Sequence, residues 1–379
     1  MRTKLKQRFL RVLVRGLYIT GLLRAIQRFA GFHILCPRRN SRLPHVRKFS
    51  GSKYLILCYH RVGIEGVPLF SRLEPSVFEA QMHYLREHYR IISLRRLCDE
   101  LREGNGPGPA LAITFDDGYR DLYKYAFPVL QKYQIPATIY LIGECVETSD
   151  APWYDRIFVA VDAARGSSLD VELETPRHFS LSSSAARASA AWEIVCYLRS
   201  IPDVVRRQWC SDFEARVKLS PERLQGRMLN WEQVREMDKG GVLFGAHTMS
   251  HPVVSRLEAA ELESELADSK RLLESRLDKP IHDFAYPFGK LQDCDIFAER
   301  FLEGCGYHSA VTTIAGFNTP ASSPYRLRRV QIGDDGSLPM FAFNIARMFL
   351  QPSVESDSAK LESQRYRRSL TPDMGANEA

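Results

Sequence analysis

The stretch LAITFDDG, residues 111–118, joins a short apolar run to two adjacent carboxylates, Asp116 and Asp117. An apolar run of this length, bounded by turn-forming residues, predicts a strand buried on both faces of a parallel sheet. Carboxylates directly after such a strand lie at the C-terminal edge of a barrel, where catalytic groups gather. Two adjacent negative charges at such a position cost free energy. A metal ion bound to one carboxylate removes this cost and leaves the other carboxylate as a base. A surface Asp-Asp-Gly turn is the alternative, but it does not by itself account for the preceding apolar strand.

The alternation of strands and helices continues on both sides of this stretch. Apolar runs predict further strands at 54–59, 137–142, 242–245, 283–285 and 309–312, and helical patterns lie at 77–90, 119–133, 256–277 and 293–304. Repeated units of this kind predict an α/β barrel. A long segment at about 150–230 is predicted to be a helical insertion, with a Ser/Ala-rich stretch at 180–191 and an amphipathic one at 192–216.

Length and composition fit one catalytic domain with appendages. The chain has 379 residues, of which 45% are hydrophobic and 26% charged, so a substantial core is expected and general disorder is excluded. We place the domain at 51–350, a basic arm at 1–50 and a disordered polar tail at 351–379. The eight cysteines are scattered singly, which predicts reduced thiols and no disulfide framework.

The N-terminal arm is strongly basic. Fifteen Lys and Arg residues precede Glu65, the first acidic residue, and arginines interrupt every apolar run within residues 1–30. We therefore expect neither a transmembrane helix nor a cleaved signal peptide. The pattern predicts two amphipathic helices, broken near Gly21, that contact an anionic membrane surface, and it places the protein peripherally on the cytoplasmic face. Helices docked on the domain are the alternative, and nucleic-acid binding is disfavoured because apolar residues alternate with the cations.

A second motif supplies two further metal-ligand types. His247-Thr-Met-Ser-His251 follows the apolar run VLFG, and this spacing can place both imidazoles on one face. Two histidines and Asp117 form a plausible open catalytic site for a divalent ion. Zinc is expected, with cobalt, manganese and nickel as alternatives.

Three motifs in this order resemble the polysaccharide deacetylase family with the NodB homology domain. They are TFDDG at 114–118, HTMSH at 247–251 and AYPFG at 285–289, and the resemblance covers roughly residues 54–345. It implies a distorted (β/α) barrel, a divalent metal ion and the hydrolysis of an N-acetyl group. The metal ligands implied by the resemblance are Asp117, His247 and His251, with Asp116 as the general base and the Phe288 N–H as a donor to the oxyanion.

The chain departs from the family pattern at two positions. Ala285 stands where many relatives have an arginine that positions the catalytic aspartate, so Asp116 must be oriented by another group. A C-terminal histidine that would act as the general acid is also missing, because the last histidine is His308. The stretch Cys58-Tyr-His-Arg-Val62 resembles the circularly permuted branch that includes exopolysaccharide deacetylases, and this resemblance makes His60 the candidate acid. A structural histidine at a strand end is the alternative.

The predicted function is therefore metal-dependent removal of acetate from an N-acetylated sugar, in a polysaccharide or a lipid-linked glycan. Hydrolysis of another non-peptide amide, such as a formamide, uses the same chemistry and stays open. A non-catalytic, metal-containing protein that binds glycans or assists their assembly is the third reading. The free carboxylate of Asp116 counts against it, since a purely structural metal site has no use for this group.

Overall fold

The computed structural model describes residues 53–64, 72–148, 150–294, 296–333 and 337–350, together with Val14 and Tyr18. The rest of the predicted basic arm and the predicted tail at 351–379 lie outside the described residues. Val14 is buried, and the ring of Tyr18 lies 6.3 Å from that of Tyr84 in the domain. The ring contact places Tyr18 against the domain.

A curved sheet of seven parallel strands forms the centre of the molecule. Its strands are β1 (Tyr54–Tyr59), β2 (Ala110–Phe115), β3 (Ala137–Leu141), β6 (Leu243–Ala246), β7 (Asp283–Ala285), β8 (Ser309–Val311) and β9 (Val330–Gln331). Their order is β8-β7-β6-β3-β2-β1-β9, and a parallel bridge links Val311 of the edge strand β8 to Leu327, in the segment that leads into the other edge strand, β9. The predicted distorted (β/α) barrel is thus confirmed. All residues of β1, β2 and β3 are buried, as their uninterrupted apolar sequences require.

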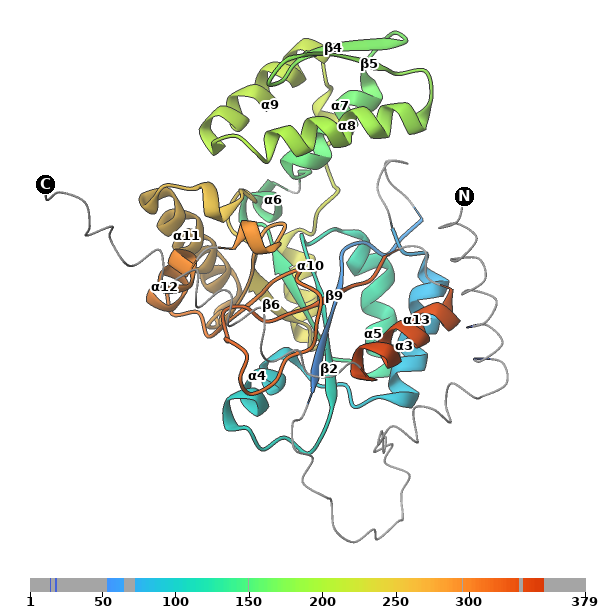
Figure 1. The fold of residues 1–379 in the computed structure, drawn as a ribbon, viewed down its shortest axis with the longest axis vertical. Coiled ribbons are helices and arrows are strands. Elements are labelled where there is room, and N and C mark those ends of the chain that lie inside the picture. Colours follow the sequence, from blue (N-terminus) through green and yellow to red (C-terminus); the bar gives the residue numbers. More distant parts are fainter. Residues whose placement is uncertain are drawn as a thin grey trace, which may run out of the picture.

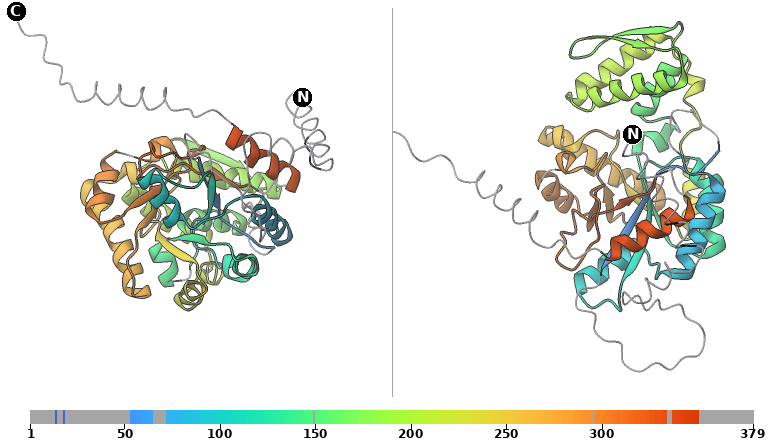
Figure 2. Two further views of the ribbon diagram at one scale, coloured as in Figure 1. Left: turned by 90° about the horizontal axis from the view of Figure 1, so that it is seen from below. Right: turned by 45° about the vertical axis from the view of Figure 1, so that its right-hand side comes forward.

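Helices cover the outside of this barrel. They are α3 (Pro75–His88), α4 (Leu94–Glu103), α5 (Phe127–Tyr133), α6 (Gly143–Thr148), α10 (Trp231–Lys239), α11 (Ala259–Leu277), α12 (Ile296–Gly304) and α13 (Leu338–Leu350). Figures 1 and 2 show α3, α5 and α13 on one flank and α11 with α12 on the other. No helix within the described part of the chain is both long enough and apolar enough to cross a membrane. The seven cysteines described there are all free, in keeping with the expected thiols.

A separate subdomain stands at one end of the barrel, at the top of Figure 1. It consists of α7 (Trp153–Ala163), β4 (Ser168–Glu172), β5 (Pro176–Ser180), α8 (Ser184–Leu198) and α9 (Asp203–Val217). We call residues 153–217 the inserted subdomain. It has its own apolar core, which includes Ile157, Ala191 and Phe213. Besides the predicted helices it contains an antiparallel hairpin, β4–β5, that the sequence pattern did not predict.

Candidate active site

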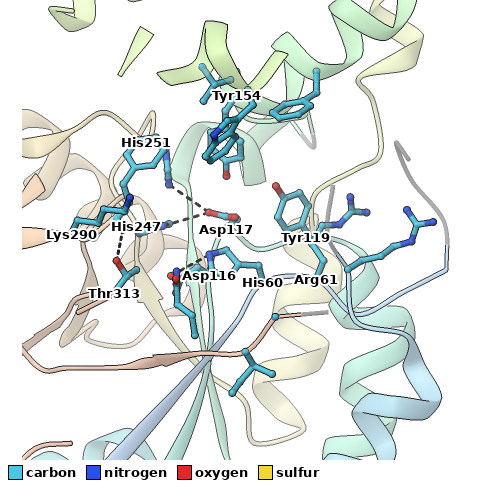
Figure 3. Close-up of a pocket in the computed structure, with 18 of the residues that line it drawn as sticks. His60, Arg61, Asp116, Asp117, Tyr119, Tyr154, His247, His251, Lys290 and Thr313 are labelled. Atoms are coloured by element: carbon cyan, nitrogen blue, oxygen red, sulfur yellow. Dashed lines mark hydrogen bonds and ion pairs between the residues drawn. The ribbon is translucent and has the colours of Figure 1, made fainter. Parts of the chain in front are cut away.

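A cleft of about 510 Å³ opens between the barrel and the inserted subdomain. All six residues singled out from the sequence line this cleft: His60, Asp116, Asp117, His247, His251 and Phe288. They come from loops that follow four different strands of the parallel sheet, β1, β2, β6 and β7. The carboxyl ends of these strands meet at one edge of the sheet, which explains why residues far apart in sequence converge here (Figure 3).

Three buried side chains form a set of metal-ligand donors. Oδ1 of Asp117 lies 3.5 Å from Nε2 of His247 and 3.6 Å from Nε2 of His251. Atoms that bind one tetrahedral zinc ion at about 2.1 Å lie about 3.4 Å apart, so these spacings fit such an ion. The buried carboxylate of Asp117 lies beside both imidazole rings, and a divalent cation would compensate its negative charge. The residues present therefore fit the predicted metal.

Hydrogen bonding fixes which histidine nitrogen faces the metal position. Nδ1 of His247 lies 2.7 Å from the carbonyl oxygen of Ala285. Because a carbonyl only accepts, Nδ1 carries the proton and Nε2 presents its lone pair toward Asp117. Burial and the neighbouring His247 lower the pKa of His251 to about 3, so the His251 ring is a neutral ligand at physiological pH.

The backbone is strained at this site. Asp117, Thr248, His251 and Phe288 have φ values of 73°, 64°, 61° and 59°, in the left-handed region that side chains with a Cβ rarely adopt. Each such residue costs on the order of 1–3 kcal/mol and persists only where the surrounding structure enforces it. The concentration of these angles around one cleft marks it as the functional site.

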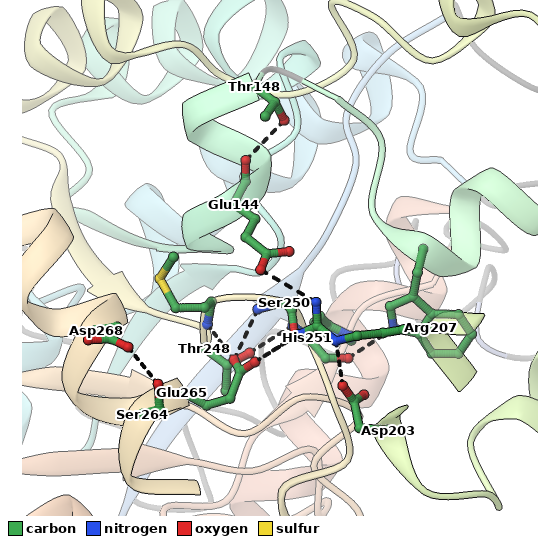
Figure 4. A network of polar contacts seen from close by, with 12 residues as sticks. Glu144, Thr148, Asp203, Arg207, Thr248, Ser250, His251, Ser264, Glu265 and Asp268 are labelled. Atoms are coloured by element: carbon green, nitrogen blue, oxygen red, sulfur yellow. Dashed lines mark hydrogen bonds and ion pairs between the residues drawn. The ribbon is translucent and has the colours of Figure 1, made fainter. Parts of the chain in front are cut away.

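Glu265 on α11 enforces the strained loop that carries the two histidines. Its carboxylate accepts hydrogen bonds from the backbone N–H groups of Met249 (2.7 Å) and Ser250 (3.0 Å) and from the Ser250 hydroxyl (2.6 Å). The guanidinium of Arg207, from α9 of the inserted subdomain, lies 3.3 Å from the same carboxylate (Figure 4). A buried acid therefore holds the loop between the metal-ligand histidines in place.

Arg329 orients Asp116, the candidate base. Its two terminal nitrogens lie 2.6 and 2.7 Å from the two oxygens of Asp116, a bidentate pair, and its Nε donates to the carbonyl of Thr312 at 2.7 Å. Arg329 is fully buried. The group expected to replace the missing arginine at Ala285 is thus an arginine from the segment that leads into β9.

This pairing keeps Asp116 ionised. Burial alone would raise the pKa of Asp116, but the adjacent Arg329 guanidinium outweighs burial and holds the pKa well below its usual range. The carboxylate is therefore charged at neutral pH and available to accept a proton. Cys58, His60 and Asp116 also lie within 4.8 Å of one another, but the guanidinium bound to Asp116 opposes a second metal ion there.

His60 lies on the open side of Asp116. Its Nε2 is 3.9 Å from Oδ2 of Asp116, and its side chain is 40% exposed to the cleft. A histidine in this position can exchange protons with a bound substrate. The half-exposed ring is poorly suited to the alternative of a structural histidine.

Two hydrogen bonds from Thr313 hold the loop that carries Phe288. The hydroxyl of Thr313 donates to the Phe288 carbonyl at 2.6 Å, and the N–H of Thr313 donates to the Gly289 carbonyl at 2.8 Å. Within the described part of the protein, the Phe288 N–H makes no hydrogen bond. It is thus free to donate to a ligand.

The inserted subdomain supplies the opposite wall. The same cleft as the metal-ligand residues is lined by Tyr154 and Phe158 of α7, Trp192 and Val195 of α8, and Arg199 directly after α8. The Arg199 guanidinium lies 3.9 Å from the centre of the Phe288 ring, across the boundary between the two parts. Trp192 is 56% exposed, so it presents a flat apolar surface to whatever binds.

The model of the polysaccharide deacetylase family matches residues 103–299, a range that includes all three quoted motifs but not His60. The chain belongs to the polysaccharide deacetylase family. The family assignment makes it a carbohydrate deacetylase, a hydrolase of non-peptide amides, as predicted.

Relatives of the deacetylase are found among bacterial proteins. YxkH of Bacillus subtilis (strain 168), which is named for the same family, is 24% identical over 78% of this chain and 77% of its own length. A protein of Escherichia coli (strain K12) named poly-beta-1,6-N-acetyl-D-glucosamine N-deacetylase is 33% identical over 98 residues. This match covers 25% of the present chain and only 15% of the Escherichia coli protein.

Solved structures support the fold. The deacetylase PplD of Streptococcus pyogenes, solved in complex with acetate, has a TM-score of 0.54 at 20% identity and covers 80% of this chain and all of its own. IcaB from Ammonifex degensii has a TM-score of 0.52 at 22% identity over 79% of this chain and 98% of its own. Both are similar to the deacetylase in fold.

Arg329 is the site residue that the sequence reasoning missed. Three arginines, Arg326, Arg328 and Arg329, precede β9, and nothing in their spacing tells which one turns inward. The available signal was indirect, since the buried Asp116 required a cation once Ala285 was found in place of the family arginine.

Proposed function

We propose that this deacetylase removes the acetyl group from an N-acetylated sugar by metal-assisted hydrolysis, with Asp116 as the general base. The observation that carries the proposal is the pair of adjacent carboxylates with different partners. Asp117 faces two histidines, whereas Asp116 is bound by Arg329 and left free of the metal position. One carboxylate is thus suited to hold an ion and the other to accept a proton.

A divalent ion held by Asp117, His247 and His251 would polarise the acetamide carbonyl and acidify the attacking water. Asp116 accepts the proton of that water. The N–H of Phe288 donates to the acetamide oxygen as negative charge develops on it, and one such donor is worth about 3 kcal/mol. His60 then gives a proton to the leaving amine nitrogen, so the products are acetate and a sugar with a free amine.

One set of assays tests which acyl group the protein removes and whether the reaction needs a metal ion. The chelated protein should be inactive, and zinc should restore acetate release from N-acetylglucosamine oligomers. The same oligomers carrying N-formyl groups separate the two amide reactions. Faster release of formate than of acetate would favour the formamide alternative, and no release of either acid from any substrate by zinc-loaded protein would favour the non-catalytic reading.

The substrate that we propose is an N-acetylhexosamine within a glycan. Two features support this choice: the names of the poly-N-acetylglucosamine deacetylases among the relatives, and the exposed indole of Trp192 on the cleft wall. Apolar faces of sugar rings stack on aromatic side chains of this kind. Trp192→Ala should raise the KM for oligomers by about tenfold and leave release from the monosaccharide nearly unchanged.

For the carrier of the glycan we propose a lipid-linked intermediate at the cytoplasmic membrane face. The support is the fifteen Lys and Arg residues ahead of Glu65, because each cation near an anionic surface contributes about 1 kcal/mol. Protein lacking residues 1–30 should lose turnover of lipid-linked substrate in anionic vesicles and keep turnover of soluble oligomers. Equal turnover of both substrates by both proteins would refute this part of the proposal.

A further inference from the structure

Three consecutive residues at the start of α7 all contact the active site. The Trp153 indole N–H donates to the carbonyl of His251 at 3.0 Å. The Tyr119 hydroxyl donates to Asp155 at 3.1 Å. Between them, the ring of Tyr154 packs 4.9 Å from the His251 ring. The first turn of the inserted subdomain is therefore fixed directly to a metal-ligand residue.

The hydroxyl of Tyr154 is buried and has no hydrogen-bond partner of good geometry within the described part of the protein, although the Tyr119 hydroxyl, which donates to Asp155, lies beside it. Figure 3 shows it pointing toward Asp117, into the space above the two carboxylates. A buried hydroxyl without a partner costs about 1–3 kcal/mol. Trp153 and Asp155 on either side are both paired, so the unpaired hydroxyl is not the result of a loosely packed helix end.

The hydroxyl of Tyr154 can donate a hydrogen bond to a ligand in the cleft. The Tyr154 and Phe288 rings lie 6.3 Å apart, and both residues line the same cleft. Two neutral donors beside a metal position form an arrangement that stabilises a developing oxyanion.

We propose that Tyr154 is a further catalytic residue of this deacetylase and that its hydroxyl donates a hydrogen bond to the acetamide oxygen of the substrate. This inference rests on the proposed function. The bond strengthens as negative charge moves onto that oxygen, and Tyr154 keeps its proton throughout. The inserted subdomain thereby completes the active site and is more than a wall of the cleft.

The test compares zinc-loaded wild-type protein with the Tyr154→Phe variant on N-acetylglucosamine oligomers. We expect kcat/KM to fall by about 100-fold, mainly through kcat, because the lost bond belongs to the transition state. Affinity for a methylphosphonamidate analogue of the acetamide should fall by a similar factor. Zinc stoichiometry and the urea midpoint of unfolding should stay as in the wild type.

Two further variants make the result decisive. Tyr197→Phe removes a hydroxyl from α8, outside the residues that line the cleft, and should leave kcat/KM and analogue binding unchanged. A Tyr154→Phe protein within twofold of the wild type, or one that loses zinc in proportion to activity, would overturn the assignment. If Asp116→Asn is inactive while Tyr154→Phe is fully active, only the role of Tyr154 fails. If the wild-type protein releases no acetate, the proposed function fails and the Tyr154 assignment fails with it.

Discussion

At the scale of single residues, the arginine that orients the base has a different origin from the one that the motif pattern suggested. The family pattern places an arginine at position 285, whereas this chain supplies Arg329 from beyond β8. The sequence predicted that another group must orient Asp116, but neither the type of that group nor its position. The reason is that the contact joins residues 213 positions apart, and only the closure of the barrel brings them together.

Replacing Arg329 should change how the reaction depends on pH. In Arg329→Met, burial acts on Asp116 without the opposing guanidinium, so the pKa of Asp116 rises and the acidic limb of kcat/KM moves to higher pH. We also expect a loss of stability of about 3–5 kcal/mol, because a buried charge loses its partner. A pH profile of acetate release and urea unfolding measure the two effects.

The double variant Ala285→Arg, Arg329→Met is the matched control. An arginine restored at the position used by many relatives should move the acidic limb back toward lower pH. If the single variant keeps the wild-type profile, Arg329 has no positioning role.

His60 should matter only when the leaving group needs a proton. His60→Ala should lower acetate release from N-acetyl sugars by roughly 10²–10⁴-fold, the usual contribution of a general acid. Hydrolysis of 4-nitrophenyl acetate should fall far less, because nitrophenolate leaves without protonation. Equal losses on both substrates would argue against an acid role for His60.

At the scale of elements, the sequence predicted most strands of the barrel. Of the inserted subdomain it predicted the approximate extent and the helical character, but not the hairpin. Buried strands have continuous apolar sequences, and β1, β2 and β7 are found where expected. The sequence did not predict the hairpin β4–β5 because each of its strands is largely exposed and has a single buried residue, so neither shows a buried apolar run. The amphipathic stretch at 192–216 is divided between α8 and α9 at Pro202, which cannot continue a helix.

The support given by α11 to the metal-ligand loop can be measured as metal affinity. Glu265→Gln places an amide N–H₂ group where the carboxylate accepts three hydrogen bonds, so the loop from His247 to His251 should loosen. We expect zinc affinity to fall by about 10–100-fold. Competition with a chromogenic chelator measures it, and Glu263→Gln, exposed on the same helix, is the control. Unchanged affinity in Glu265→Gln would show that the loop holds its geometry unaided.

At the scale of the whole molecule, metal binding and folding should be coupled. Asp117, His247 and His251 come from loops after two different strands, so an ion bound by all three binds the folded protein only. Free zinc at a thousand times its dissociation constant should add about 4 kcal/mol to the free energy of unfolding. Thermal unfolding of chelated and zinc-loaded protein measures this gain. His247→Ala should abolish it, whereas His178→Ala, on the exposed hairpin, should retain it.

The most direct test of the central claim is acetate release by zinc-loaded wild-type and Asp116→Asn proteins with equal zinc content. The division of labour between the two carboxylates predicts that wild-type protein releases acetate from N-acetylglucosamine oligomers. It also predicts that the variant loses at least about 100-fold in rate while it keeps the metal. An Asp116→Asn protein as active as the wild type, or a zinc-loaded wild type that releases no acetate from any N-acetylated glycan, would contradict it.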